Sequence, residues 1–99
     1  MHRDNALQAE LAAIRTRLAE IQRQLLTTQG VDLNVEVHSL GDGSEVVISG
    51  DTTGLVHIAL WALDCAKSDV AGKHAHIDEA GIANVGSTPL VIARAGAKL

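Results

Sequence analysis

The sequence predicts an α+β fold in which an N-terminal heptad helix precedes a β-β-α-β-β unit. Apolar residues recur at heptad spacing near the N-terminus, two segments alternate with the period of a half-buried strand, and one long apolar segment has helical length. We expect the four strands to form one antiparallel or mixed sheet, with the second helix buried on it. Residues 1–29 would form the amphipathic, coiled-coil helix, and residues 30–99 a small α+β domain.

The N-terminal helix is expected over roughly residues 5–28. An apolar stripe only two residues in seven wide is typical of a coiled-coil seam, so it favours self-association over packing on the chain's own sheet. A parallel tetramer is the first expectation and a dimer the second, with Glu10 of one chain paired to Arg15 of another. The predicted oligomerisation seam comprises Leu7, Leu11, Ile14, Leu18, Ile21 and Leu25.

A hairpin is expected after this helix. Residues 31–38 alternate apolar and polar side chains without a break, which predicts a strand with one buried face. Gly41-Asp42-Gly43 marks a turn, and residues 44–49 return as the second strand. Because Val46-Val47-Ile48 is continuously apolar, we expect this second strand to be covered on both faces.

The second helix and two further strands complete the predicted unit. Asp51 is placed to cap the helix, and residues 55–66 are apolar almost all round, so the helix should be covered on more than one side. Residues 74–78 alternate again and predict the third strand. The fourth is mainly Leu90 to Ala95, because Pro89 is tolerated only at a strand's start or edge.

Composition and charge restrict the partners of the chain. The net charge is −4, and the acidic excess lies in residues 30–99, where four Lys and Arg face nine acids. An acidic domain repels phosphates and suits a basic protein, and the absence of Phe and Tyr argues against a base-stacking surface for nucleic acid. The single Cys65 excludes an intramolecular disulfide, so we expect a cytoplasmic protein. No apolar segment is long enough to predict a membrane span.

A histidine pair raises the alternative of a metal site. His74, His76 and Asp78 share one face of the third strand, and His38 or His57 could supply another nitrogen for zinc. The polar, solvated face of a half-buried strand is the favoured interpretation, because no third ligand can be placed. We therefore expect neither catalytic residues nor a cofactor. A metal-binding protein or small metal-dependent enzyme remains the alternative.

Several short motifs follow one another between Val46 and Ile92. They are Val47-Ile48-Ser49-Gly50-Asp51-Thr52-Thr53-Gly54-Leu55, an aliphatic helix, His74-Ala75-His76-Ile77-Asp78, Gly86-Ser87 and Leu90-Val91-Ile92. In order and spacing they resemble family thirty-two of the polymorphic-toxin immunity proteins, whose pattern is strand, Gly-Asp, Gly-Leu, helix, His-x-His-Leu-Asp. Ile77 replaces the usual leucine, Pro89 replaces a polar residue, and the heptad helix lies outside the pattern.

The resemblance implies a non-catalytic bacterial immunity protein that binds and neutralises a cognate protein toxin. A basic nuclease would suit the acidic domain. An oligomeric coiled-coil adaptor is a second alternative, because the heptad helix is an addition to the family pattern. Strand alternation would place the predicted partner-binding residues on one polar sheet face: Asp32, Asn34, Glu36, His38, His74, His76 and Asp78.

Overall fold

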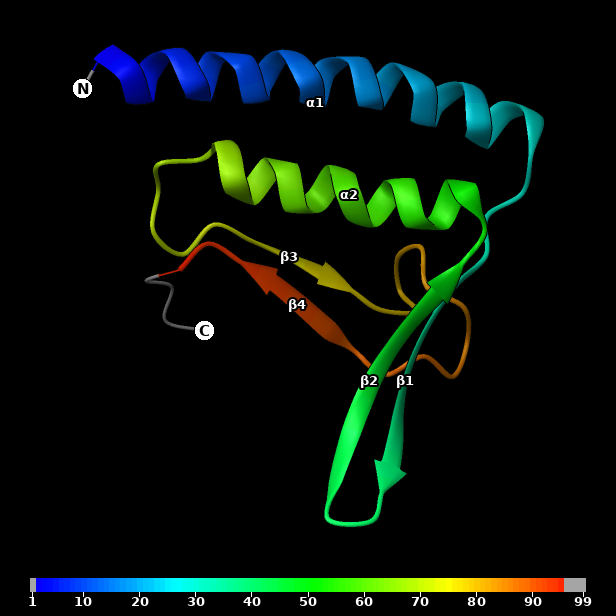
Figure 1. Cartoon of the computed structure of the whole chain (residues 1–99). Coiled ribbons are helices and arrows are strands. Elements are labelled where there is room, and N and C mark those ends of the chain that lie inside the picture. The colour runs from blue at the N-terminus through cyan, green and yellow to red at the C-terminus, as the bar shows by residue number, and fades with distance from the viewer. Residues whose placement is uncertain (1, 96–99) are drawn as a thin grey trace.

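The computed structural model describes residues 2–95, with side chains from residue 6 onward. The elements are α1 (His2–Thr28), β1 (Leu33–Leu40), β2 (Gly43–Gly50), α2 (Thr52–Lys67), β3 (His74–Ile77) and β4 (Leu90–Ala93). The α+β class and the order of elements are confirmed. In Figure 1, α1 lies along α2, β3 and β4 lie against the other side of α2, and the β1–β2 hairpin projects away from this body.

The strands form two separate antiparallel pairs, β1–β2 and β3–β4, so the single four-stranded sheet is not confirmed. The segment 84–88 occupies the second edge of β1 instead. The amides of Asn84 and Thr88 donate to the carbonyls of Leu33 and Val35 at 2.8 and 2.7 Å. Because these irregular residues satisfy the β1 carbonyls, β4 is free to pair with β3 alone.

A small core lies where the base of the hairpin meets α2 and the β3–β4 pair. Leu33 and Val35 of β1 are fully buried there together with Ile77 of β3 and Ala83 of the following loop. Partly buried side chains surround this cluster: Ile58, Trp61, Ile82, Leu90 and Ile92. The core therefore fixes only the base of the hairpin to the rest of the chain.

A close backbone contact joins the hairpin to α2. The Asp51 carboxylate accepts a hydrogen bond from the Gly54 amide at 2.8 Å, which confirms the predicted helix cap. The Asp51 amide donates to the Asp32 carbonyl at 3.0 Å. A Cβ on either Gly50 or Gly54 would overlap that same carbonyl oxygen. The Gly-Asp-Thr-Thr-Gly segment is thus a packing joint that requires glycine at both ends.

One prediction of burial is wrong and another is confirmed. Val46 and Ile48 of β2 are 56% and 37% exposed, because the hairpin extends beyond the body that covers its base. The helix α2 is covered on more than one side, toward α1 and toward the core, as predicted, although Leu55 is 46% exposed and one flank is open. The alanines on this open flank are Ala59, Ala62 and Ala66.

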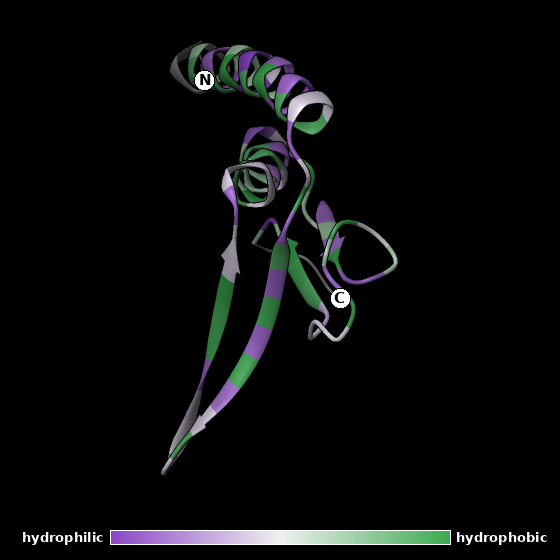
Figure 2. Cartoon of the chain, turned by 90° about the vertical axis from the view of Figure 1, so that its right-hand side faces the viewer, coloured by the Kyte–Doolittle hydropathy of each residue, from purple (hydrophilic) through white to green (hydrophobic). Residues whose placement is uncertain are grey.

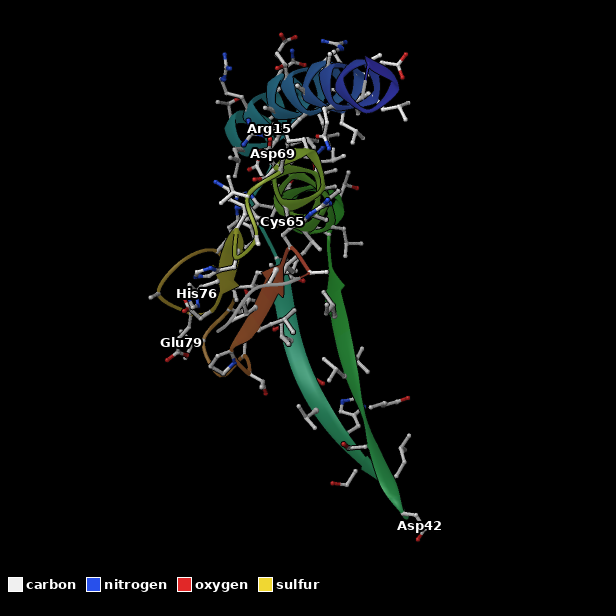
Figure 3. All side chains as sticks on the ribbon, turned by 90° about the vertical axis from the view of Figure 1, so that its left-hand side faces the viewer. Arg15, Asp42, Cys65, Asp69, His76 and Glu79 are labelled. Atoms are coloured by element: carbon white, nitrogen blue, oxygen red, sulfur yellow. The ribbon has the colours of Figure 1, made fainter. Side chains whose placement is uncertain are left out.

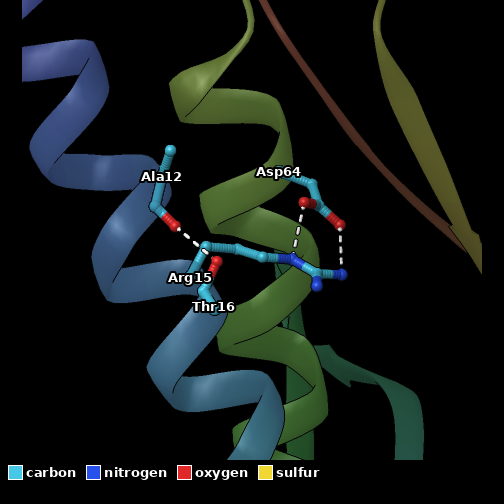
Figure 4. A network of polar contacts seen from close by, with 4 residues as sticks. All are labelled: Ala12, Arg15, Thr16 and Asp64. Atoms are coloured by element: carbon cyan, nitrogen blue, oxygen red, sulfur yellow. Dashed lines mark hydrogen bonds and ion pairs between the residues drawn. The ribbon is translucent and has the colours of Figure 1, made fainter.

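The helix α1 packs antiparallel to α2 within the same chain. Arg15 makes a two-pronged ion pair with Asp64 of α2, at 2.8 Å from Nε to Oδ1 and 3.1 Å from Nη2 to Oδ2 (Figure 4). Further along α1, Gln22 reaches Thr53 near the start of α2. Arg15, which a parallel coil would pair with Glu10 of another chain, is therefore engaged inside its own chain.

A buried polar contact fixes the other half of this helix pair. Gln22 is only 4% exposed, and its amide nitrogen donates to the Thr53 carbonyl at 3.0 Å. The same nitrogen lies 3.0 Å from His57 Nδ1. Because an amide nitrogen can only donate, Nδ1 must accept and the imidazole must be neutral. Burial and, after it, the positive charge of Arg15 lower the pKa of His57 below its ordinary 6.5.

We expect the free energy of unfolding to fall as the pH drops below 6.5, the ordinary pKa of His57. As the pH falls, His57 takes up a proton in the unfolded chain before it does so in the folded chain. The neutral imidazole therefore contributes its full stability above pH 6.5, and this stability is lost as the pH falls toward the lower pKa of the folded state. Urea titrations at about pH 8 and about pH 5.5 measure the loss. His57→Gln, which cannot titrate, should lose less stability over this interval. An equal loss in both proteins would contradict the assignment.

Candidate functional site

The seven predicted partner-binding residues do not share one face. Because the strands form two separate pairs, the residues fall into three groups. Asp32 and Asn34 lie at the base of the hairpin, and Glu36 and His38 lie further out on β1. The third group lies on and just after β3: His74, His76 and Asp78. Figure 3 shows His76 well away from the hairpin tip at Asp42.

The first group holds the 84–88 segment on β1. The Asn84 side-chain amide donates to the Asp32 carboxylate and, at 3.2 Å, to the side-chain oxygen Oδ1 of Asn34. The Asn34 amide in turn lies 3.4 Å from the Asp32 carboxylate. These polar atoms bind one another, so we assign Asp32 and Asn34 to positioning the loop. The role of Asn84 was not predicted from the sequence, because an asparagine in a loop carries no signal for a distant partner.

The third group combines two exposed histidines with a turn-forming carboxylate. The rings of His74 and His76 lie 5.0 Å apart in an edge-to-face arrangement. His74 Nδ1 lies 2.8 Å from the Gly72 carbonyl oxygen, to which it donates. The Asp78 carboxylate accepts from the Ala80 amide at 3.1 Å. Across the part of the chain with described side chains, no three His, Cys, Asp or Glu residues gather into a potential metal set.

The second group lies on the projecting part of the hairpin. His38 Nε2 is 2.8 Å from the Glu36 carboxylate, and Nδ1 is 3.8 Å from the carboxylate of Glu45 on β2. Glu45 was missed in the sequence, although His38 and Glu45 are paired across the hairpin. The two-residue turn at Gly41-Asp42 was the available signal, because counting outward from such a turn sets the register.

The opposite face of the hairpin carries an apolar stripe. Val37 pairs with Val46 and Val35 with Ile48, so these side chains share a face with the buried Leu33. Val37 and Val46 are 50% and 56% exposed, however, and Ile48 is 37% exposed. Figure 2 shows the alternation of hydropathy along β1 out to the projecting end. The stripe therefore runs from the core onto a surface that no described residue covers fully.

Acidic residues and a free strand edge accompany this stripe. Between residues 24 and 66 the sequence has no Lys or Arg, and the charged residues of the hairpin besides histidine are Glu36, Asp42 and Glu45, all exposed. The outer edge of β2 pairs with no other strand in the described part of the chain. We call residues 36–48 the outer hairpin. An exposed apolar face with charged residues on the same element is typical of a protein-binding surface.

Comparisons of the chain with protein-family profiles, with curated proteins and with solved structures each return no match. Within residues 2–95, neither helix is long and apolar enough to cross a membrane. The function is therefore inferred from the fold, from the outer hairpin and from the sequence motifs.

Proposed function

We propose that this chain is a non-catalytic protein-binding domain that docks on a basic partner protein through the outer hairpin. The observation that carries the proposal is the exposure of Val37, Val46 and Ile48 on one face of a hairpin whose other face carries acidic side chains. Removing this apolar stripe from water would supply most of the affinity, while the acidic side chains of the hairpin would steer the encounter. The free edge of β2 could also accept a strand from the partner.

Inhibition of a toxin is the specific form of this function that the sequence resemblance implies. Proteins that act on nucleic acid need a basic surface, and an acidic projecting hairpin complements such a surface. An inhibitor of this kind acts by binding alone, so it requires no catalytic group of its own. We propose that the chain neutralises its toxin in the cytoplasm of the producing cell.

The polypeptide encoded beside the gene for this chain is the partner to test. Charge reversal by Glu45→Lys should slow its association with the chain by at least about tenfold at low salt, because attraction becomes repulsion. Asp69→Lys makes the same change of charge at an exposed position after α2 and should have little effect. Stopped-flow kinetics over a range of ionic strengths measure both rates.

Comparing the two variants distinguishes an effect of the outer hairpin from an effect of the net charge of the chain. Equal slowing by Glu45→Lys and Asp69→Lys would show that net charge, and not the outer hairpin, controls the encounter. Failure of the unmodified chain to bind the neighbouring polypeptide at micromolar concentration would overturn the proposed function. Circular dichroism of each variant confirms that its fold is intact, as expected for exposed substitutions.

A further inference from the structure

The apolar residues of the α1 seam point in two directions, and one set packs against α2 of the same chain. Arg15 and Gln22 bond to residues of α2 and so define the face that α1 turns toward α2. At 100° per residue, Leu11 and Leu18 lie nearest this face, and both are half-buried. This column of leucines therefore has its partner in α2.

The second column is more exposed among the residues with described side chains. Leu7, Ile14 and Ile21 follow one another at intervals of seven residues and point roughly 80° away from the α2-facing side. Leu7 is 51% exposed and Ile14 is 54% exposed, while Ile21 is half-buried. These side chains form an apolar column about 21 Å long on the outside of α1. We call it the outer column.

The charged residues beside the outer column would complement those of a second copy if the two α1 helices were antiparallel. Around a twofold axis at Ile14, two antiparallel α1 helices would place Leu7 of one copy against Ile21 of the other. Glu10 and Arg17 flank the column on the same side, and each would face its opposite charge in the second copy. A parallel arrangement in register would instead place Glu10 opposite Arg15 of the second copy.

We propose that a second copy of this chain docks on the outer column with its α1 antiparallel. Arg15, the cation that a parallel pairing would need, is engaged by Asp64. Arg17 pairs only with Glu20 on its own helix, at 3.0 Å between exposed side chains. Such surface pairs are weak, so Arg17 can change partner readily. The outer hairpin projects from the side opposite α1, so both hairpins of the dimer stay accessible (Figure 1).

Disulfide cross-linking tests both the surface and the orientation. Ile14→Cys at the twofold axis should form a covalent dimer under mild oxidation, and a mixture of Leu7→Cys with Ile21→Cys should form a mixed dimer. The unmodified chain, whose only thiol is the buried Cys65, gives the background. Arg23→Cys is exposed on the opposite side of α1 and is the matched control.

Leu7→Cys alone linking as well as the mixture would overturn the antiparallel orientation. Linkage at Ile14→Cys no greater than at Arg23→Cys would overturn the interface itself. Both results concern α1 only, so they are separate from the fate of the proposed function, which rests on the outer hairpin.

A charge exchange tests the complementarity of the flanking residues. In sedimentation experiments, Glu10→Arg should raise the dimer dissociation constant by about tenfold, because two arginines would then face each other. The double variant Glu10→Arg/Arg17→Glu should restore dimerisation, since the opposite charges are exchanged and not lost. A monomeric unmodified chain at about 100 µM, or no recovery in the double variant, would contradict the proposal.

Discussion

Gly54→Val is expected to lower the free energy of unfolding by at least about 3 kcal/mol. The new side chain would overlap the Asp32 carbonyl and press on Leu33, whose side chain belongs to the core. Moving the start of α2 away would also disturb the bond between the Asp51 amide and that carbonyl. Urea unfolding followed by circular dichroism measures the loss.

Gly43→Val is the matched control for this change. Gly43 lies in the hairpin with open space around the position of a Cβ, so valine there should be tolerated. If Gly54→Val unfolds at the same urea concentration as the unmodified chain, the packing joint between hairpin and helix is not required.

Val46→Asp is expected to weaken binding of the partner protein by at least about 30-fold. A carboxylate at the centre of the apolar stripe would have to be desolvated in the complex without a partner for its charge. Val46 is 56% exposed in the free chain, so its stability should change by less than about 1 kcal/mol. Titration calorimetry with the polypeptide encoded beside the gene measures the affinity.

Val85→Asp introduces the same charge at a position that is 92% exposed on the 84–88 segment, which bonds to the base of the hairpin at Leu33 and Val35 and not to the outer hairpin. Its affinity for the partner should stay within about threefold of the unmodified chain. Equal weakening by the two substitutions would remove the apolar stripe from the proposed interface.

Local elements were predictable from the sequence because their signals are local. Alternation over residues 31–38 and the turn signal Gly41-Asp42-Gly43 predicted the hairpin, and Asp51 predicted the start of α2. The separation of the two strand pairs carries no such signal. The 84–88 segment binds β1 through backbone amides, which nearly any sequence provides, so the side-chain pattern does not show that this edge is occupied.

Burial was harder to predict than secondary structure. Alternation places Val35 and Val37 on the same face of β1, but it does not show that Val35 is covered by the core and Val37 is half exposed. The position of α1 depends in the same way on a distant residue. Its heptad spacing predicts an apolar seam, whereas the pairing of Arg15 with Asp64 joins residues 49 positions apart and turns only one column toward α2.

The candidate site was predictable only in part, for the same reason. Glu36 and His38 lie on the outer hairpin as the alternation of β1 suggested, next to the unpredicted Glu45. Asp32 was expected on a partner-binding face, but it binds Asn84 instead. Long-range hydrogen bonds decide which polar residues stay available, and a single sequence does not contain them.

Co-expression with the polypeptide encoded beside the gene tests most directly whether the outer hairpin makes this chain an inhibitor. Growth of cells producing that polypeptide is measured alone, with the unmodified chain, with Val46→Asp and with Val85→Asp. We predict that the polypeptide arrests growth, that the unmodified chain and Val85→Asp restore it, and that Val46→Asp does not. Growth that the unmodified chain fails to restore, or that Val46→Asp restores equally well, would contradict the proposal.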